Sequence, residues 1–132
     1  MSRFLREFFR PVTIEGQMID SLIDTLNVIS EDHLNIILKS QGLNEDVKRN
    51  DLCEFLPQAF EKDLKSLDGN LIKAFNDIYR GIIDYTKDET YIILKKFTDK
   101  GYIFIYTNND GKYFNYRIPD EICQVFEKLL RL

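Results

Sequence analysis

The strongest constraint on the fold is a stretch over residues 86–119, in which a helical pattern passes through one glycine into two strand-like segments. Residues 86–89 read Thr-Lys-Asp-Glu, a capping box in which the Thr86 hydroxyl accepts the amide proton of Glu89 while the Glu89 side chain reaches back. Apolar residues at helical spacing follow, namely Ile93, Leu94 and Phe97. Because Gly101 supplies the left-handed residue that ends a helix, a helix is predicted from the capping box to Gly101.

A hairpin is predicted directly after this glycine. Residues 102–107 and 112–118 are rich in β-branched and aromatic side chains, and they flank a turn of sequence Asn-Asn-Asp-Gly that tolerates positive φ. Alternation along the first strand separates two sets of side chains, Tyr102, Phe104 and Tyr106 on one face and Ile103 and Ile105 on the other. We therefore expect one face to join the core and the other to expose aromatic rings.

The bulk composition fits one compact unit with two lobes, residues 1–63 and 64–132. At 132 residues and 44% hydrophobic content, the chain can bury one core without disulfides or a metal. The net charge is -4 and is unevenly spread: residues 1–63 carry seven Lys or Arg against twelve Asp or Glu, and residues 64–132 carry eleven against ten. A domain that holds duplex DNA by phosphate neutralisation alone shows a clear positive excess, which this chain lacks.

Two cysteines and the absence of a long apolar run favour a cytoplasmic protein. Cys53 and Cys123 lie among apolar neighbours without CxxC spacing, so both are interpreted as small core residues in a reducing compartment. No apolar run approaches the length of a membrane span, and residues 1–10 are too charged for a secretory signal.

Residues 1–10 form a predicted amphipathic helix that stops before Pro11. Its apolar side chains are Phe4, Leu5, Phe8 and Phe9. Two interpretations stay open, because this cluster suits docking onto the body of the protein and also suits an arm that binds a partner or a membrane surface.

The next two helices are predicted over residues 14–29 and from the Ser30 cap to Gly42. From there the spacing of one set of residues resembles the SAP motif, a helix-loop-helix unit of DNA-associated proteins: Leu34, Leu38, Gly42, Leu43, Lys48, Asp51, Leu52 and Leu56. The resemblance implies a small leucine core and an association with DNA. Leucines at this spacing also suit the core of any helical hairpin.

The second half resembles a winged helix-turn-helix domain. The preceding helix is interrupted at Pro57, and residues 58–64 either continue it or open a new turn. An apolar stripe over residues 66–82 then predicts a helix, Gly81 marks a short turn, and the capped helix and hairpin follow. Helix, turn, helix and hairpin in this order is the winged-helix arrangement. Pro119 suits the first turn of a last helix, whose apolar side is expected to pack on the preceding helices or on a second subunit as a homodimer. The fold class is thus mainly α with one β-hairpin (α+β).

No residue set predicts catalysis, a metal site or a cofactor site. His33 is the single histidine and is interpreted as a surface or helix-start residue, and Asp20 and Asp24 as a solvated helix face. The sequence contains no P-loop, GxGxxG or GxSxG motif, and we expect a protein that is not an enzyme. Asp110 to Lys112 has the D-x-K form of some nucleases, but the hairpin turn already accounts for it.

Two functions from different classes remain. The two resemblances imply a nucleic-acid-associated regulator of bacterial or phage type, which is the preferred hypothesis, with phosphate contacts from Lys48, Arg49, Lys87, Lys95, Lys96, Lys100, Lys112 and Arg117. The alternative is a protein-interaction module, an adaptor or inhibitor without direct nucleic-acid binding, with an interface made by Phe4, Phe8, Tyr102, Phe104 and Tyr106. Asp88 and Glu89 favour the alternative, because negative charge at the start of a recognition helix repels the DNA backbone.

Overall fold

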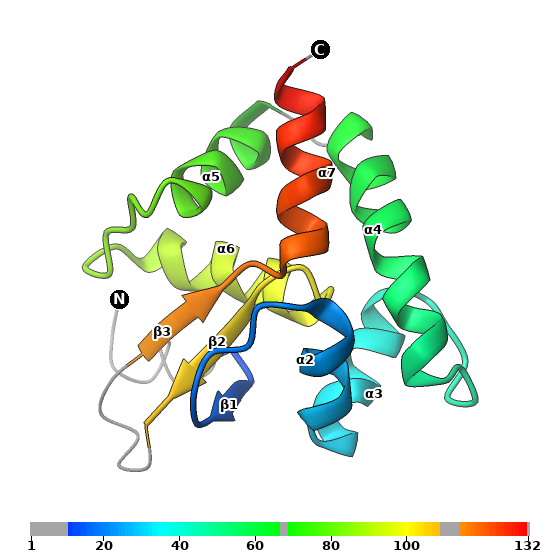
Figure 1. Cartoon of the computed structure of the whole chain (residues 1–132). Helices are drawn as coiled ribbons and strands as arrows, with labels where there is room; N and C mark the ends of the chain where they lie inside the picture. The colour runs from blue at the N-terminus through cyan, green and yellow to red at the C-terminus, as the bar shows by residue number, and fades with distance from the viewer. Residues whose placement is uncertain (1–10, 67–68, 109–113, 132) are drawn as a thin grey trace.

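The computed structural model describes residues 11–66, 69–108 and 114–131 and shows helices arranged around a small sheet (Figure 1). The elements in chain order are β1 (Thr13–Glu15), α2 (Leu22–Val28), α3 (Glu31–Ser40), α4 (Arg49–Ser66), α5 (Gly69–Tyr79), α6 (Asp88–Asp99), β2 (Phe104–Thr107), β3 (Phe114–Arg117) and α7 (Asp120–Leu130). The predicted class, mainly α with a small β component, is confirmed. No helix among the described residues has the length and apolar character to cross a membrane.

The central strand of the sheet is β2. It pairs in antiparallel fashion with β3, with Phe104 opposite Arg117, which confirms the two strands of the predicted hairpin. On its other edge β2 pairs in parallel with β1, with Thr13 opposite Ile105, a pairing that the sequence did not predict. The turn residues Asn109 to Gly111 and Lys112 lie outside the described residues.

The expectation of an exposed aromatic face on the hairpin is wrong. Tyr102, Phe104 and Tyr106 are at most 2% exposed, and Ile103 and Ile105 on the opposite face are at most 4% exposed. Strands occupy both edges of β2 and its two faces are both covered, so alternation along this strand separates two buried sets of side chains.

The helix predicted over residues 14–29 is wrong in its first half. Ile14 lies in β1 and pairs with Tyr106, and Gly16 at φ 121° follows this short strand. The helix begins only at α2, where the Ser21 side chain caps it by accepting a hydrogen bond from the Asp24 backbone nitrogen. The apolar residues that recur at helical spacing over this range are therefore divided between a strand and a short helix. Residues 1–10, with the predicted helix and its Phe4 and Phe8, lie outside the described residues.

The interruption predicted at Pro57 is also wrong, because α4 runs through this residue as one helix. A proline inside a helix costs about 3 kcal/mol. Side chains buried at every fourth position offset this cost, since each contributes roughly 1.5–3 kcal/mol; they are Leu52, Leu56, Phe60 and Leu64. The lobe boundary predicted at residue 63 falls inside α4, and a single buried cluster draws side chains from both sides of it.

Local signals placed the ends of α3 correctly. Ser30 caps α3 by accepting a hydrogen bond from the His33 backbone nitrogen, and Gly42 after the helix has φ 71°. The leucines of the SAP-like spacing reach one core, with Leu34, Leu38, Leu52 and Leu56 buried and Leu43 packed against them. The SAP and winged-helix resemblances themselves stay predictions.

The predicted capping box at the start of α6 is wrong, whereas its predicted end is confirmed. Lys87 is the N-cap residue, and the Thr86 hydroxyl instead donates a hydrogen bond to Asp84 Oδ1 at 2.5 Å. Gly101 has φ 81°, and a Cβ atom there would lie 3.0 Å from Leu56 Cδ1. Both the backbone angle and the close approach therefore require glycine at this position.

The last helix, α7, follows Pro119, which is its N-cap residue and not part of its first turn. It lies between α4 and α5 (Figure 1). Its Phe126 ring packs against Phe75 and Tyr79, with ring centroids 4.9 Å and 5.2 Å apart. The most deeply buried part of its apolar side therefore packs on the preceding helices.

His33 lies at the start of α3 as expected, but the prediction of a surface residue is wrong because its side chain is 1% exposed. Its ring packs at 5.6 Å from that of Phe104, and Nε2 has no hydrogen-bond partner among the described residues. Burial lowers the pKa of His33 from 6.5 to about 4, although the Asp99 carboxylate acts in the opposite direction. The folded protein therefore holds a neutral imidazole near neutral pH.

This burial predicts a loss of stability in mild acid. The unfolded chain binds a proton on His33 below about pH 6.5 and the folded chain only near pH 4, so the free energy of unfolding falls as pH drops through this window. Between pH 7 and pH 5 the His33 contribution falls by about 2 kcal/mol. Urea unfolding at both pH values should show a larger drop for the wild type than for His33→Leu. Equal drops would contradict the burial of a neutral histidine.

Candidate interaction groove

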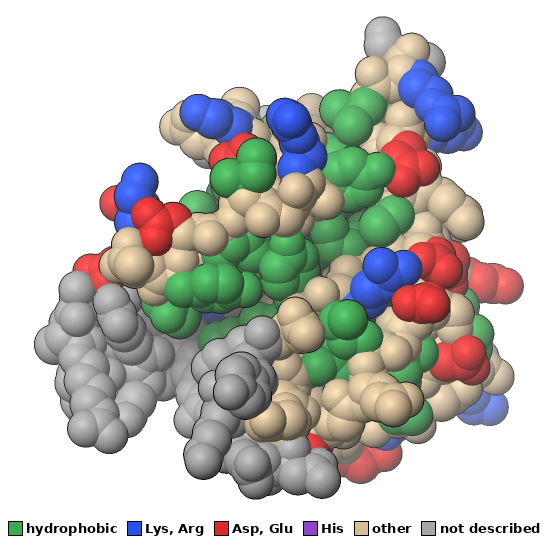
Figure 2. All heavy atoms as spheres, turned by 60° about the vertical axis from the view of Figure 1, so that its left-hand side comes forward, with side chains coloured by type: hydrophobic (Ala, Val, Ile, Leu, Met, Phe, Trp, Pro, Cys, Tyr) green, Lys and Arg blue, Asp and Glu red, His purple; other side chains and the backbone are tan. Residues whose placement is uncertain are grey.

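An open groove lies between the end of α5, strand β3 and α7, and it encloses about 570 Å³. Figure 2 shows hydrophobic side chains gathered over this face of the molecule. The apolar lining residues are Ile78, Tyr79, Gly81, Tyr116, Ile118 and Cys123. Charged residues also line it, namely Arg80, Arg117, Asp120 and Glu127. We call this site the interaction groove.

The turn after α5 shapes one end of the groove. Gly81 has φ 78°, and the Ile82 backbone nitrogen donates to the Asp77 carbonyl at 2.8 Å, which closes the end of the helix. The Tyr116 hydroxyl donates to the Ile78 carbonyl at 2.7 Å and so holds β3 against the same helix end. Ile82, which directly follows the lining residues of α5, is 58% exposed.

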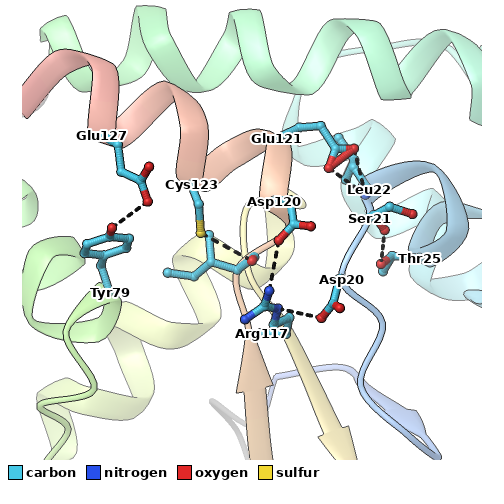
Figure 3. Close-up of polar contacts among 11 residues, drawn as sticks. Asp20, Ser21, Leu22, Thr25, Tyr79, Arg117, Asp120, Glu121, Cys123 and Glu127 are labelled. Atoms are coloured by element: carbon cyan, nitrogen blue, oxygen red, sulfur yellow. Dashed lines mark hydrogen bonds and ion pairs between the residues drawn. The ribbon is translucent and has the colours of Figure 1, made fainter.

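Three of the four charged side chains of the groove, Arg117, Asp120 and Glu127, are bonded to one another or to neighbouring residues (Figure 3). The Tyr79 hydroxyl donates to Glu127 Oε1 at 2.6 Å, and this hydrogen bond raises the pKa of Tyr79. Arg117 lies between two carboxylates, with Nε 3.1 Å from Asp20 Oδ1 and Nη2 2.9 Å from Asp120 Oδ1. Four polar side chains of the groove, those of Tyr79, Arg117, Asp120 and Glu127, therefore already have partners within the protein.

The sulfur of Cys123 adds to the apolar character of the groove. Its thiol donates weakly to the Ile118 carbonyl at 3.5 Å and forms no disulfide. Burial raises the pKa of Cys123 to about 11, and nearby carboxylates act in the same direction while Arg117 opposes them. The side chain is thus a protonated thiol, and it lacks the lowered pKa of a nucleophilic cysteine.

Hydrogen bonds at the start of α7 hold this wall of the groove in place (Figure 3). The Glu121 carboxylate accepts from the Leu22 backbone nitrogen at 2.9 Å and 3.2 Å, at the first residue of α2. The Asp120 backbone nitrogen donates to the Asp20 carbonyl at 2.8 Å. The N-terminal ends of α2 and α7 are thereby joined, although 99 residues separate the two partners of the Glu121 contact.

Half of the eight residues predicted to contact nucleic acid already have acidic partners within the protein. These four make ion pairs: Arg49 with Glu31, Lys95 with Asp99, Lys100 with Asp63, and Arg117 with Asp20 and Asp120. Lys48, Lys87 and Lys96 are exposed and form no ion pair with another described residue, whereas Lys112 lies outside the described part of the chain.

Arg49 in particular has a structural role that the sequence did not indicate. Its Nη1 atom donates to the carbonyls of Leu26 and Ile29 at 2.6 Å and 2.7 Å, which satisfies acceptors at the end of α2. Of the predicted interface residues, Tyr102, Phe104 and Tyr106 are buried in the core, and the Tyr102 hydroxyl donates to Asp63.

The predicted recognition helix α6 presents little surface. Of its twelve residues only Glu89 and Lys96 are exposed, and the rest are half-buried or buried. A helix that enters the major groove of DNA needs one free face to contact base edges. The groove was missed as a site because Arg117 was expected to contact phosphate and Cys123 was interpreted as a core residue. The apolar Ile82 and Tyr85 in the turn after Gly81 were the available signal.

The state of Cys123 can be tested by alkylation. With a pKa near 11, its thiolate fraction at pH 8 is about two orders of magnitude below that of an ordinary cysteine. Iodoacetamide at pH 8 should therefore modify Cys123 roughly a hundredfold more slowly in the native protein than in guanidinium, as measured by peptide mass spectrometry. Comparable rates in the two states would contradict this environment.

Within the part of the chain that the structure describes, no three His, Cys, Asp or Glu side chains are grouped so that they could hold a metal ion. Comparisons of the chain with protein-family models, with curated proteins and with solved structures found no match.

Proposed function

We propose that the protein is an interaction module, an adaptor or inhibitor, that binds an apolar segment of a partner protein in the interaction groove. One observation carries this proposal: two large apolar side chains, Ile82 and Tyr85, are exposed in the turn beside an open groove. Inside the groove Tyr79 already bonds to Glu127 and Arg117 to Asp120. Exposed apolar patches of this kind mark interaction sites on soluble proteins.

Large apolar side chains next to the groove strengthen the proposal. Ile82 is 58% exposed and Tyr85 is 42% exposed, both in the turn between α5 and α6. Covering such a side chain contributes roughly 1.5–3 kcal/mol, and a few anchors of this size dominate many interfaces. A partner that lies along the groove and reaches this turn can bury these side chains together with the groove lining.

Charge contributes little to recognition in this proposal. The groove carries two basic and two acidic side chains, and Arg117 already pairs with Asp120. Apolar contacts depend weakly on salt, whereas phosphate contacts weaken steeply as salt rises. Salt dependence therefore separates a protein partner from a nucleic acid.

DNA binding is the weaker candidate. Phosphate contacts through Arg49, Lys95, Lys100 or Arg117 would compete with the ion pairs that these side chains make inside the protein. The net charge of -4 and the limited exposure of α6 also oppose close approach to a duplex. Two observations still support DNA binding. The elements follow the order α5, turn, α6 and hairpin, and Lys87 and Lys96 are exposed.

The test compares two substitutions of exposed apolar residues. Linear peptides are selected from a random display library on the wild-type protein, and their affinities are then measured for Ile82→Asp and Val28→Asp. Val28 is a matched control because it is 54% exposed at the end of α2 and does not line the groove. We expect Ile82→Asp to weaken binding about tenfold or more and Val28→Asp to change it less than about twofold.

Two results would contradict the proposal. One is equal binding of the selected peptides to both variants. The other is tight binding of labelled AT-rich or GC-rich duplexes at about 50 mM salt that is lost in Lys96→Ala and kept in Ile82→Asp, because this pattern identifies phosphate contacts.

A further inference from the structure

A second hollow shares no lining residue with the interaction groove. It lies where α4, α5 and the end of α6 meet, and it encloses about 380 Å³, within the range of small-molecule sites of roughly 300–1,000 Å³. Phe60, Leu71 and Phe97 supply apolar lining, while Lys96 and Lys100 line the same hollow from α6 and the residue after it.

The aromatic rings behind this hollow are fixed by their packing. Phe60 contacts Tyr102 edge-on with ring centroids 4.9 Å apart, and Phe97 contacts Phe75 at 5.1 Å. The Tyr102 hydroxyl donates to Asp63 Oδ2 at 2.5 Å, which fixes the ring further. A hollow with a fixed floor binds a ligand without the cost of ordering its own side chains.

Among the described residues, the charges around the hollow leave one ammonium group without a carboxylate. Asp63 pairs with Lys100 at 3.4 Å, and Asp99 pairs with Lys95 at 2.9 Å. Lys96 is exposed and makes no ion pair with any residue that the structure describes. A ligand that enters the hollow therefore meets, beside apolar walls, a positive charge that no described carboxylate compensates.

The carbonyl groups at the end of α6 do not compete for this ammonium group. The Phe97 carbonyl accepts from the Tyr102 backbone nitrogen, and the Thr98 carbonyl accepts from that of Gly101. The Lys100 carbonyl accepts from Gln41 Nε2 at 2.8 Å. These bonds satisfy acceptors that would otherwise attract Lys96 or a donor on the ligand.

We propose that this hollow binds a small organic monoanion, a carboxylic acid whose apolar body is one ring or a short branched chain. The apolar body contacts Phe60, Leu71 and Phe97, and the carboxylate pairs with Lys96 Nζ. A monoanion matches the single uncompensated charge, and its apolar body excludes water from the hollow floor.

The test uses two probes of nearly the same size, 3-phenylpropanoate and the neutral 3-phenylpropan-1-ol. Both are titrated into the 132-residue protein while amide signals of Leu71, Lys96 and Phe97 are followed by NMR. We expect saturable shifts at millimolar concentration and a roughly threefold preference for the acid, the size expected of an exposed ion pair.

Lys96→Gln should remove this preference and leave the alcohol's affinity unchanged. Lys48→Gln is the matched control, because Lys48 is equally an exposed lysine without an ion pair to a described residue and does not line the hollow. The proposal is overturned if neither probe shifts these signals, if acid and alcohol bind the wild type equally, or if the preference persists in Lys96→Gln.

Discussion

The fold depends on the burial of β2, a strand whose side chains are covered on both faces and whose two edges are both paired. The backbone N–H and C=O groups of such a strand need partners on β1 and β3. An unpaired peptide group away from water costs about as much free energy as a lost hydrogen bond. The N-terminal β1 and the C-terminal β3 therefore meet on one strand. The helices that cover the strand form a single core with it.

Gly101 is the point at which this strand meets the helical part of the chain. Its positive φ turns the backbone out of α6, and side chains from α3 and α4 approach the place that a Cβ atom would occupy, with Ile37 Cγ2 at 3.2 Å. A larger residue would both strain the backbone and displace these side chains. The connection from α6 to β2 thus couples the direction of the strand to the packing of two helices.

The interaction groove lies where this packing of helices and strands leaves the surface between α5, β3 and α7 open. β3 is an edge strand, α5 ends at Tyr79 before the Gly81 turn, and α7 follows β3 through Pro119. The Tyr116, Arg117 and Glu121 contacts hold these elements at fixed positions and use polar groups of the site. A groove bordered by three elements stays open in consequence, next to the exposed side chains of Ile82 and Tyr85, and this is the physical basis of the proposed interaction with another protein.

Local signals predicted a large part of the fold, because a cap or a glycine acts over one turn of chain. Ser30, Gly42 and Gly101 were each placed correctly on this basis, and so were the two strands of the hairpin. The parallel pairing of β1 with β2 was missed because Thr13 and Ile105 are far apart in the sequence and no local pattern links them.

Features decided by tertiary contacts were the ones that sequence reasoning misjudged. Pro57 stays inside α4 because of the buried side chains around it, and His33 is neutral because Phe104 and the core cover it. Arg49 looked like a phosphate ligand, yet the end of α2 supplies it with two carbonyl acceptors. The groove likewise depends on contacts between distant elements, so the sequence signalled it only through the apolar Ile82 and Tyr85 in the turn after α5.

Hydroxyl-radical footprinting with mass spectrometry tests the central claim most directly, namely that the aromatic side chains of β2 belong to the core while the open apolar surface lies at the α5 turn. Tyr85 is 42% exposed and Tyr106 is 2% exposed, so oxidation of Tyr85 and Ile82 should be fast in the native protein. Phe104 and Tyr106 should become reactive only after unfolding. Oxidation of Phe104 and Tyr106 at the rate of Tyr85 in the native protein would contradict the account.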